Sequence, residues 1–326
     1  MKLINIKNKK LVILIIVLYS LLILSLLIPI KGYKIDLPGN ISPIAKEIQI
    51  EELSSNNEFY SIYILSYKNP TLFQMLVGNL TDKVDVYKDN TQTSSSLDFF
   101  RGALLEELSF QYAIINAYEK ANEEDPLITI DYKLDSYVIT YSVNSNIDVG
   151  LRFTHVDNKH INEFTTEELA NYFKANNTVT LTVLDLENNT TKNLEITKTD
   201  GLFGIVYDKY FVINDSNPKY ETFYEKDQKV GPSGGLLQTL EIYALLTKRK
   251  FNKIISGTGT ISPEGKVGPI GGVKQKIYTA NKKVDIFFIP ESQYNEALEV
   301  YNKIKKPTFS LVKVSDFNEA VETLLS

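Results

Sequence analysis

Two short glycine-rich segments carry the residues whose types and spacing best suit catalysis. Gly231-Pro232-Ser233-Gly234-Gly235 sets one hydroxyl between glycines, directly before an apolar pattern with helical spacing. Gly268-Pro269-Ile270-Gly271-Gly272-Val273-Lys274 sets an amine just after a glycine turn, where another helical pattern begins. A serine nucleophile needs a base, which is usually a histidine. The only histidines of the chain, His155 and His160, lie in another region of the sequence. The pair predicts a serine hydrolase with Lys274 as its base.

Both residues are expected at helix N-termini. There, free backbone N–H groups and the helix dipole favour the negative oxygen of a tetrahedral intermediate on Ser233. A free lysine, with a pKa of about 10.4, is protonated at neutral pH, so Lys274 must be buried to act as a base. Thr258 is expected to hold the neutral amine by a hydrogen bond, and Lys276 is expected to point away as a solvated surface charge. The apolar wall around the base would come from Ile270, Val273 and Ile277.

These segments resemble the proteolytic domain of the Lon family over roughly residues 201–326. That family carries Pro-Ser-Ala-Gly at its nucleophile, then Thr-Gly, then Pro-Ile-Gly-Gly-x-Lys. The resemblance implies that Ser233 is the nucleophile, that Lys274 is the general base and that Thr258 lies near the lysine. It also implies a fold of mixed strands and helices.

The chain departs from the Lon pattern at two positions beside the nucleophile. Val230 stands where many Lon proteins have an aspartate, which puts substrate positioning in question, and Gly234 replaces the usual alanine. Gly231 and Gly234 are the expected supporting residues, because glycines let a substrate backbone approach closely. Backbone amides around Gly231 and Ser233 are expected to hold the oxyanion. Because Pro232 has no N–H, another segment is expected to supply one donor.

A long apolar run near the N-terminus predicts a membrane anchor. Residues 11–30 contain no charged residue, and this length matches a membrane-spanning helix. Four lysines precede the run, so residues 1–10 are expected to be a cytoplasmic tail and the body to lie outside the cell membrane. A cleaved signal peptide is the competing interpretation, but its apolar core is shorter and ends in a small-residue site.

The remaining sequence predicts an α/β (α+β) fold. An alternating pattern marks a strand over residues 60–66, and apolar spacing marks a helix over residues 97–121. Glu106 and Glu107 of that helix are adjacent and cannot share a face, so both are expected to be solvated surface charges rather than an acid–base pair.

Three units are expected outside the anchor. Residues 31–123 resemble the first half of a Lon proteolytic domain in the order of their elements. Residues 124–200 resemble a diverged PDZ domain, which binds an extended peptide beside a strand. Residues 201–326 complete the Lon-type domain, so the PDZ-like unit is expected to be an insertion, with residues 48–121 packed against residues 201–326.

Composition and motifs exclude several kinds of site. The chain has no cysteine, so it has neither disulfides nor thiolate metal ligands. A net charge of −5 argues against nucleic-acid binding. The stretch from Gly259 to Lys266 is no phosphate loop, because five residues separate Gly259 from Gly265 where four are required and Val267 replaces the Ser/Thr. We therefore expect no ATP hydrolysis, no metal and no cofactor.

The sequence thus predicts a membrane-anchored extracytoplasmic Ser–Lys endopeptidase whose PDZ-like module presents peptide or protein substrates. One alternative is a catalytically inactive membrane-tethered peptide-binding scaffold, which Val230 and Gly234 leave open. A signal-peptidase-like enzyme, which also uses a Ser–Lys pair, would place its nucleophile close behind the membrane span. The natural substrate and the oligomeric state remain open at this stage.

Overall fold

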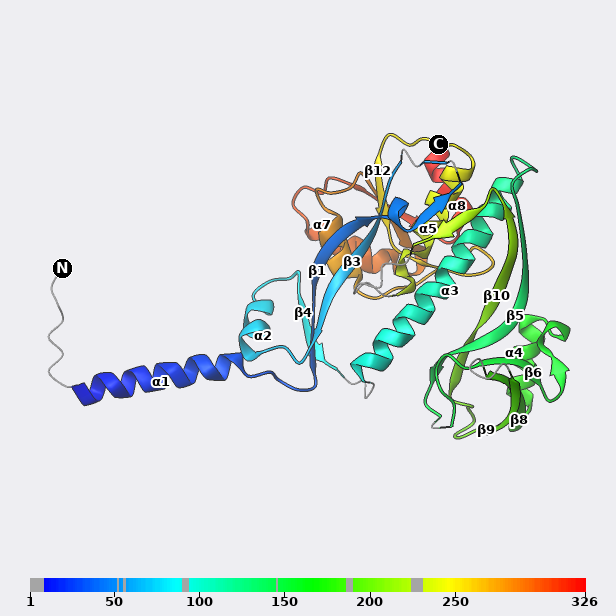
Figure 1. Ribbon diagram of the computed structural model, residues 1–326. Helices are drawn as coiled ribbons and strands as arrows, with labels where there is room; N and C mark the ends of the chain where they lie inside the picture. The colour runs from blue at the N-terminus through cyan, green and yellow to red at the C-terminus, as the bar shows by residue number, and fades with distance from the viewer. Residues whose placement is uncertain are drawn as a thin grey trace.

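The computed structural model describes residues 9–51, 53–54, 57–89, 94–144, 146–185, 190–223 and 231–326. Within these ranges the chain forms two six-stranded sheets and two small strand pairs. Figure 1 shows the two sheets in separate parts of the molecule, which we call the body and the module (residues 129–217), with helix α3 (Ser95–Asn122) between them.

Strands from both halves of the chain build the first sheet, in the order β16-β15-β12-β3-β1-β4. Their bounds are β1 (Tyr33–Pro43), β3 (Glu58–Lys68), β4 (Asp85–Lys88), β12 (Ile254–Gly257), β15 (Ile286–Pro290) and β16 (Ser310–Val314). The β3, β12, β15 and β16 strands are parallel, whereas β1 pairs antiparallel with both β3 and β4. The β3–β12 pairing therefore joins the segment before the module to the segment after it.

Helices cover both faces of this sheet. They are α3 (Ser95–Asn122), α5 (Gly235–Leu246), α6 (Val273–Ala280), α7 (Tyr294–Lys303) and α8 (Phe317–Leu325). Along β15, Phe288 packs in one core with α3, α5 and α8, while Phe287 packs in a second core with α6 and α7. All five residues of β15 are buried, as expected for a parallel strand covered on both faces.

The long helix α3 packs against elements from both halves of the body. Ser94 caps its first turn by accepting the N–H of Leu97, and the stripe expected from the sequence is buried along its length. That stripe consists of Leu104, Leu108, Tyr112, Ile115 and Tyr118. The prediction of a helix here is confirmed, with bounds slightly wider than expected.

The second sheet is built from one continuous stretch of chain, in the order β10-β5-β6-β8-β9, with β7 paired to β6. Its elements are β5 (Thr129–Ser142), β6 (Arg152–Val156), β7 (Lys159–His160), α4 (Thr166–Ala175), β8 (Thr178–Asp185), β9 (Thr190–Thr197) and β10 (Ile205–Asn217). The module has a core of its own, centred on Phe153 and Leu181.

The expected boundary at residue 200 cuts through this module. Strand β10 lies beyond that boundary, yet it pairs with β5 along its whole length. The far halves of both strands also pack on α3, because Val138 and Phe211 belong to the body core. The pairing of β10 with β5, which are far apart in sequence, therefore places residues 205–217 in the module, whereas the local sequence pattern suggested a boundary at residue 200.

Two short strand pairs complete the body. Strand β2 (Ile48–Ile50) pairs with β11 (Tyr220–Thr222), and β13 (Thr260–Ile261) pairs with β14 (Val267–Gly268). The first pair adds another contact between the two halves of the body.

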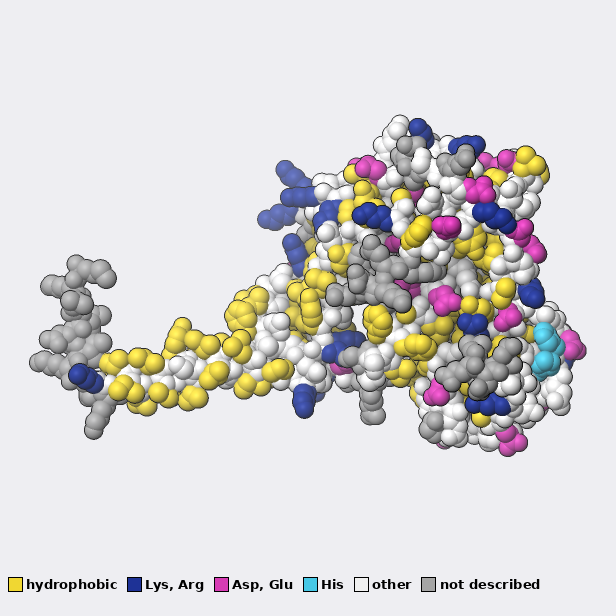
Figure 2. Space-filling view, in the orientation of Figure 1, with side chains coloured by type: hydrophobic (Ala, Val, Ile, Leu, Met, Phe, Trp, Pro, Cys, Tyr) yellow, Lys and Arg dark blue, Asp and Glu magenta, His cyan; other side chains and the backbone are white. Residues whose placement is uncertain are grey.

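Near the N-terminus, α1 (Lys9–Leu27) projects from the body as a single rod (Figure 1). Figure 2 shows that its surface is almost entirely apolar, and its large apolar side chains are exposed. Short helix α2 (Leu72–Gly78) lies at its base, where the Ile30 N–H donates to the Pro70 carbonyl. Judged by length and apolarity together, no helix in the described ranges qualifies as a membrane span.

A fragment of residues 201–326 is expected to remain unfolded by itself. It would lack β3, the parallel partner of β12, and α3, which packs against α5. Circular dichroism during thermal unfolding would test this, with residues 31–326 as the control that should melt cooperatively. A cooperative transition in the short fragment would show that the two halves of the body are independent domains.

Candidate active site

The nucleophile candidate lies in a tight turn that leads into α5. Gly231 has φ +137°, which favours glycine, and Pro232–Gly234 form a single 3-10 turn that continues into the helix. Ser233 is half-buried at this start. The turn therefore places the Ser233 hydroxyl at a helix N-terminus, as expected.

Hydrogen bonds from two directions fix this turn. The Ser233 carbonyl accepts from Thr258 Oγ1 at 3.0 Å and from the Gly259 N–H at 2.9 Å, just beyond the end of β12. On the other side, Ser109 of α3 donates its hydroxyl to the Pro232 carbonyl at 3.2 Å. The position of Ser233 thus depends on both β12 and α3.

The lysine beside this turn is Lys276. Its side chain is buried, with only 3% of the residue exposed, and its Nζ donates to Thr258 Oγ1 at 2.8 Å. Burial lowers the pKa of Lys276 from 10.5 to about 7. Thr258 therefore connects the amine of Lys276 to the carbonyl of Ser233, and the expectation that Lys276 is a solvated surface charge is wrong.

Lys274 has a different environment. Its ammonium pairs with the Asp85 carboxylate, and it lies 3.5 Å from the Val84 carbonyl, both at β4. The expected burial of Lys274 in an apolar wall beside Thr258 is wrong. Thr258 does hold a lysine amine, but that amine belongs to Lys276.

The spacing along α6 explains the difference. Val273, Ile277 and Ala280 are buried at intervals of four and three residues, and Lys276 falls on the same stripe. Lys274 lies two positions away from Lys276, on another face. The apolar stripe was therefore a signal in the sequence that Lys276 is the buried lysine.

The turn before α6 also depends on glycine. Gly272 has φ +71°, and an added Cβ would lie 2.7 Å from Ile64 Cδ1. A larger residue would be strained at this φ and would require the Ile64 side chain to shift. The Gly-Gly pair therefore sets how closely the helix that carries Lys276 approaches the sheet.

The supporting glycines differ in what they tolerate. A Cβ at Gly234 would meet no atom closer than 3.8 Å, so the alanine usual in Lon proteins would fit there. A Cβ added at Gly235, by contrast, would lie 2.3 Å from Ser109 Oγ, so a side chain does not fit there. The Gly231 N–H lies near the Glu106 carboxyl. Val230 lies outside the described residues.

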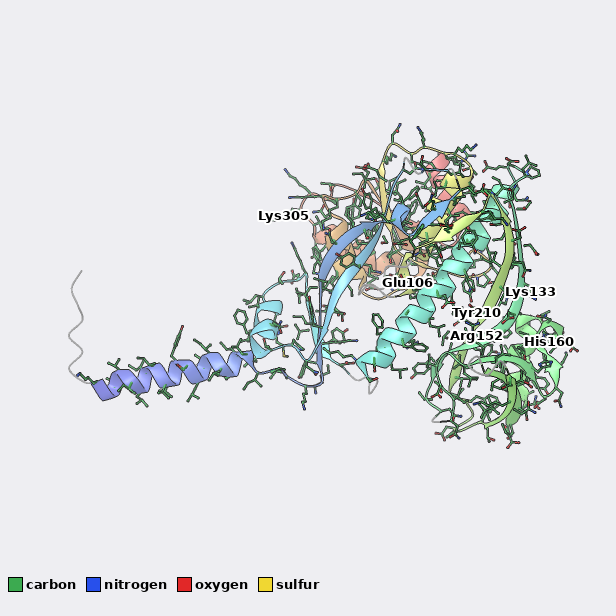
Figure 3. The ribbon with its side chains drawn as sticks, viewed as in Figure 1. Glu106, Lys133, Arg152, His160, Tyr210 and Lys305 are labelled. Atoms are coloured by element: carbon green, nitrogen blue, oxygen red, sulfur yellow. The ribbon has the colours of Figure 1, made fainter. Side chains whose placement is uncertain are left out.

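Glu106 is not the solvated surface charge that was expected. Burial, followed by the nearby charge of Glu47, raises the pKa of Glu106 to about 7, although the Gly231 N–H opposes the shift. Neighbouring Glu107 accepts a hydrogen bond from Tyr210 of β10 at 3.0 Å. Glu106 and Glu107 line the same hollow, Glu106 near Glu47 and Glu107 at Tyr210 of the module; Figure 3 labels Glu106 on α3 and Tyr210 on β10.

Two hollows flank α3 near the nucleophile turn. One has a volume of about 820 Å³ and is lined by Glu106 and by Gln238 of α5. The other, of about 310 Å³, is lined by Pro232 and Gly268. Pro232 of the nucleophile turn thus lines the smaller hollow, whereas Gln238 of the following helix lines the larger one.

The two histidines do not join this site. His155 and His160 pair across β6 and β7 of the module, with ring centroids 4.8 Å apart. Across the described residues, no group of three or more His, Asp or Glu side chains comes together as a metal site.

Replacing Lys276 with methionine is expected to stabilise the fold by about 1–2 kcal/mol near pH 6. The unfolded chain protonates Lys276 below about pH 10.5, but the folded chain does so only below about pH 7. The penalty of burying this lysine is therefore complete below about pH 7 and disappears as pH rises toward 10.5. Calorimetry from pH 6 to 10 should show a gain that shrinks with pH, whereas Lys274→Met, the control, should lack this trend. A gain independent of pH would contradict the burial of Lys276.

Comparison with known proteins covers the segment that holds this site. Residues 226–326 match the family model of the Lon protease (S16) C-terminal proteolytic domain. A Lon protease of Mycoplasma mobile is 35% identical over 97 residues, which make up 29% of this chain and 12% of that relative. A Lon protease of Porphyromonas gingivalis is 33% identical over 97 residues, which cover 30% of this chain and 12% of that relative. A Lon protease of Dictyoglomus thermophilum is 30% identical over 116 residues, which cover 32% of this chain and 15% of that relative.

The matches are short relative to these proteins, since the chain spans 12–15% of the length of the three relatives. The matched segment nevertheless includes Ser233, Thr258 and Lys276. The resemblance drawn from the motifs is thereby confirmed: residues 226–326 are a relative of the Lon protease C-terminal proteolytic domain.

Proposed function

We propose that this protein is a serine peptidase in which Ser233 is the nucleophile and Lys276 the general base. One observation carries the assignment: a buried lysine with a lowered pKa donates to Thr258, whose hydroxyl holds the Ser233 carbonyl. Lys274 is a weaker candidate, because its ammonium is paired with Asp85. The similarity of residues 226–326 to the Lon proteolytic domain supports a peptidase.

The reaction follows from these positions. Ser233 Oγ attacks the scissile carbonyl carbon while Lys276 takes the hydroxyl proton. The C–N bond of the intermediate then breaks, and Lys276 returns the proton to the leaving amine. Water attacks the acyl ester with Lys276 again as base, which releases the second product and restores Ser233.

The negative oxygen of the intermediate needs donors near the start of α5. The N–H groups of Ser233 and Gly234 are our candidates, because the helix N-terminus there favours a negative charge. The Gly231 N–H, which lies near the Glu106 carboxyl, is a further candidate. No step of this reaction requires a nucleotide or a metal.

We also propose that the module presents peptides and that α1 anchors the protein in the cell membrane. Strand β9 is an edge strand of the module sheet, and such an edge can pair with an extended peptide in the manner of a PDZ domain. The exposed apolar side chains of α1, within the uncharged run of residues 11–30, support an anchor. The lysines before the run favour a cytoplasmic N-terminus and an extracytoplasmic body.

Peptide cleavage should require Lys276 and not Lys274. With an unbiased peptide mixture, Ser233→Ala and Lys276→Ala should each lose activity by about 10³-fold or more, because the two groups act as a unit. Lys276→Arg should not restore activity, since arginine stays protonated. The wild-type rate should rise as pH increases through about 7, where Lys276 loses its proton.

The matched control is Lys274→Ala, which should keep activity within about threefold, as expected for loss of a partly exposed ion pair. Mass spectrometry of the products gives the readout. Loss of activity in Lys274→Ala with retention in Lys276→Ala would return the base to Lys274. Peptide binding without cleavage at any pH would favour the inactive scaffold.

Single cysteines can test the topology, because the chain has none of its own. A membrane-impermeant maleimide added to intact cells should label Glu123→Cys in the body but not Lys2→Cys in the tail. Both should react after the cells are permeabilised. Labelling of Lys2→Cys alone in intact cells would reverse the proposed orientation, and recovery of the labelled body without the membrane would exclude the anchor.

A further inference from the structure

Backbone contacts fix helix α2 to the base of α1. The Ile30 N–H donates to the Pro70 carbonyl at 2.9 Å. The Leu72 N–H donates to the Ile28 carbonyl at 3.3 Å, and the Thr71 side chain caps the first turn of α2. Helix α2 therefore begins where the chain leaves α1, and these bonds set its position relative to α1.

One side of α2 is apolar and exposed. On its inner side, Gly78 is buried, and a Cβ added there would lie 3.0 Å from Val86 of β4 and 3.1 Å from Ile35 of β1. The outer side chains recur at intervals of three and four residues, which is the spacing of one helix face. They are Phe73 (53% exposed), Leu76 (52%), Val77 (47%) and Leu80 (86%), and we call them the α2 stripe.

The α2 stripe continues the apolar surface of α1. Leu27 and Ile28, where α1 ends, are 59% and 55% exposed, and Ile28 holds the first residue of α2 through its carbonyl. Figure 2 shows apolar side chains along α1 and on the side of the body from which it projects. A contiguous exposed apolar surface of this kind marks a site of contact with a partner or a membrane.

A group of exposed lysines lies on two neighbouring loops of the body. Thr308 joins the loops, because its hydroxyl accepts the Lys282 N–H at 2.8 Å and its own N–H donates to Asn281 Oδ1 at 3.2 Å. The loops, residues 281–283 and 302–308, contain five lysines and no acid. Four of these lysines are exposed and form what we call the lysine patch: Lys282, Lys303, Lys305 and Lys306.

The lysine patch faces the same side of the molecule as the α2 stripe. Figure 2 shows cationic side chains that project on the side of the body from which α1 extends, and Figure 3 places Lys305 there. Asp285 lies close in sequence, but its carboxylate accepts the Ile254 N–H at 2.8 Å. Glu299 lies one helical turn before Lys303, so the lysines remain in excess.

We infer that this face of the body docks on a lipid bilayer with anionic headgroups. The α2 stripe enters the boundary between headgroups and acyl chains to a depth of about 5–10 Å, as is usual for an interfacial helix, and the lysine patch meets the phosphates. This inference rests on the proposed anchor for the orientation of the body. A second copy of the chain is a poorer occupant, because a symmetric pair that buried this face would bring two lysine patches together.

The test uses full-length protein with single cysteines, because the chain has none of its own. A nitrobenzoxadiazole probe is attached at Leu80→Cys in the α2 stripe, at Leu18→Cys in α1 or at Leu202→Cys in the module. Leu202 is the matched control, since it is an exposed leucine (72%) outside the proposed face. Each protein is reconstituted in vesicles of phosphatidylcholine and phosphatidylglycerol.

Brominated lipids then report the depth of each probe. Bromine near the headgroup end of the acyl chain should quench the probe at position 80, and bromine near the chain end should quench the probe at position 18. Neither lipid should quench the probe at position 202. Circular dichroism reports folding, and Phe73→Cys provides the measurement if Leu80→Cys does not fold.

The lysine patch should make docking depend on lipid charge. Each lysine near an anionic surface favours docking by about fivefold at low salt. Replacing all four lysines of the patch with glutamine should therefore lower the ratio of docked to undocked body, read from the probe at position 80, by about tenfold or more. Vesicles without phosphatidylglycerol should have a similar effect. The matched control replaces four exposed lysines of the module with glutamine and should dock like the wild type: Lys133, Lys159, Lys174 and Lys192.

The results separate docking from the proposed anchor. Quenching at position 18 without quenching at position 80, in a folded protein, overturns the docked face and leaves the anchor in place. Quenching at position 80 alone supports the docked face although the anchor fails. A probe at position 80 that is shielded from iodide in water but is not quenched by lipid is covered by a second copy, which overturns the inference. Equal docking of the two glutamine variants overturns the assignment to anionic headgroups.

Discussion

A lysine can serve as a base near neutral pH only where its pKa is lowered enough to leave the amine neutral, and burial does this for Lys276. The Nζ atom donates to Thr258 Oγ1 at 2.8 Å, and the residue is buried on the inward stripe of α6. Burial by itself would destabilise the protein, because a lysine is charged in the unfolded chain. The neighbouring sheet and helices must therefore be stable enough to hold this amine inside.

That stability comes from a sheet built by distant parts of the chain. Strand β12, which ends just before Thr258, lies between β3 from the first half and β15 from the second. Strand β3 also carries Ile64, against which the turn before α6 packs. The contacts of Thr258 and Lys276 thus depend on residues that precede the module, although the similarity to Lon proteases covers residues 226–326.

Helix α3 links the nucleophile turn to the rest of the molecule. Ser109 holds the Pro232 carbonyl, Glu106 lies near Gly231, and the same helix packs against α5 and against the strands that lead into the module. The same helix separates the two hollows beside the turn, so it shapes the space available to a bound chain.

Much of the candidate site and of its neighbouring helices could be predicted from the spacing of residues along the sequence. The Ser233 turn, the helix that follows it, the buried stripe of α3 and the resemblance to the Lon proteolytic domain all depend on residues close in sequence, whose spacing reports periodicity and turn chemistry. The presence of a buried lysine after the Gly-Gly turn was also predictable, and so was its hydrogen bond to Thr258.

The apolar stripe of α6 marks Lys276 as the inward lysine, but the partners of the two lysines were decided by the tertiary structure. The docking of α6 on the sheet brings Lys276 to Thr258 and Lys274 to Asp85. The tertiary structure likewise raised the pKa of Glu106 and joined β10 to the module. Burial and charge environment are set by neighbours that are distant in sequence, and local spacing carries no information about which neighbours those are.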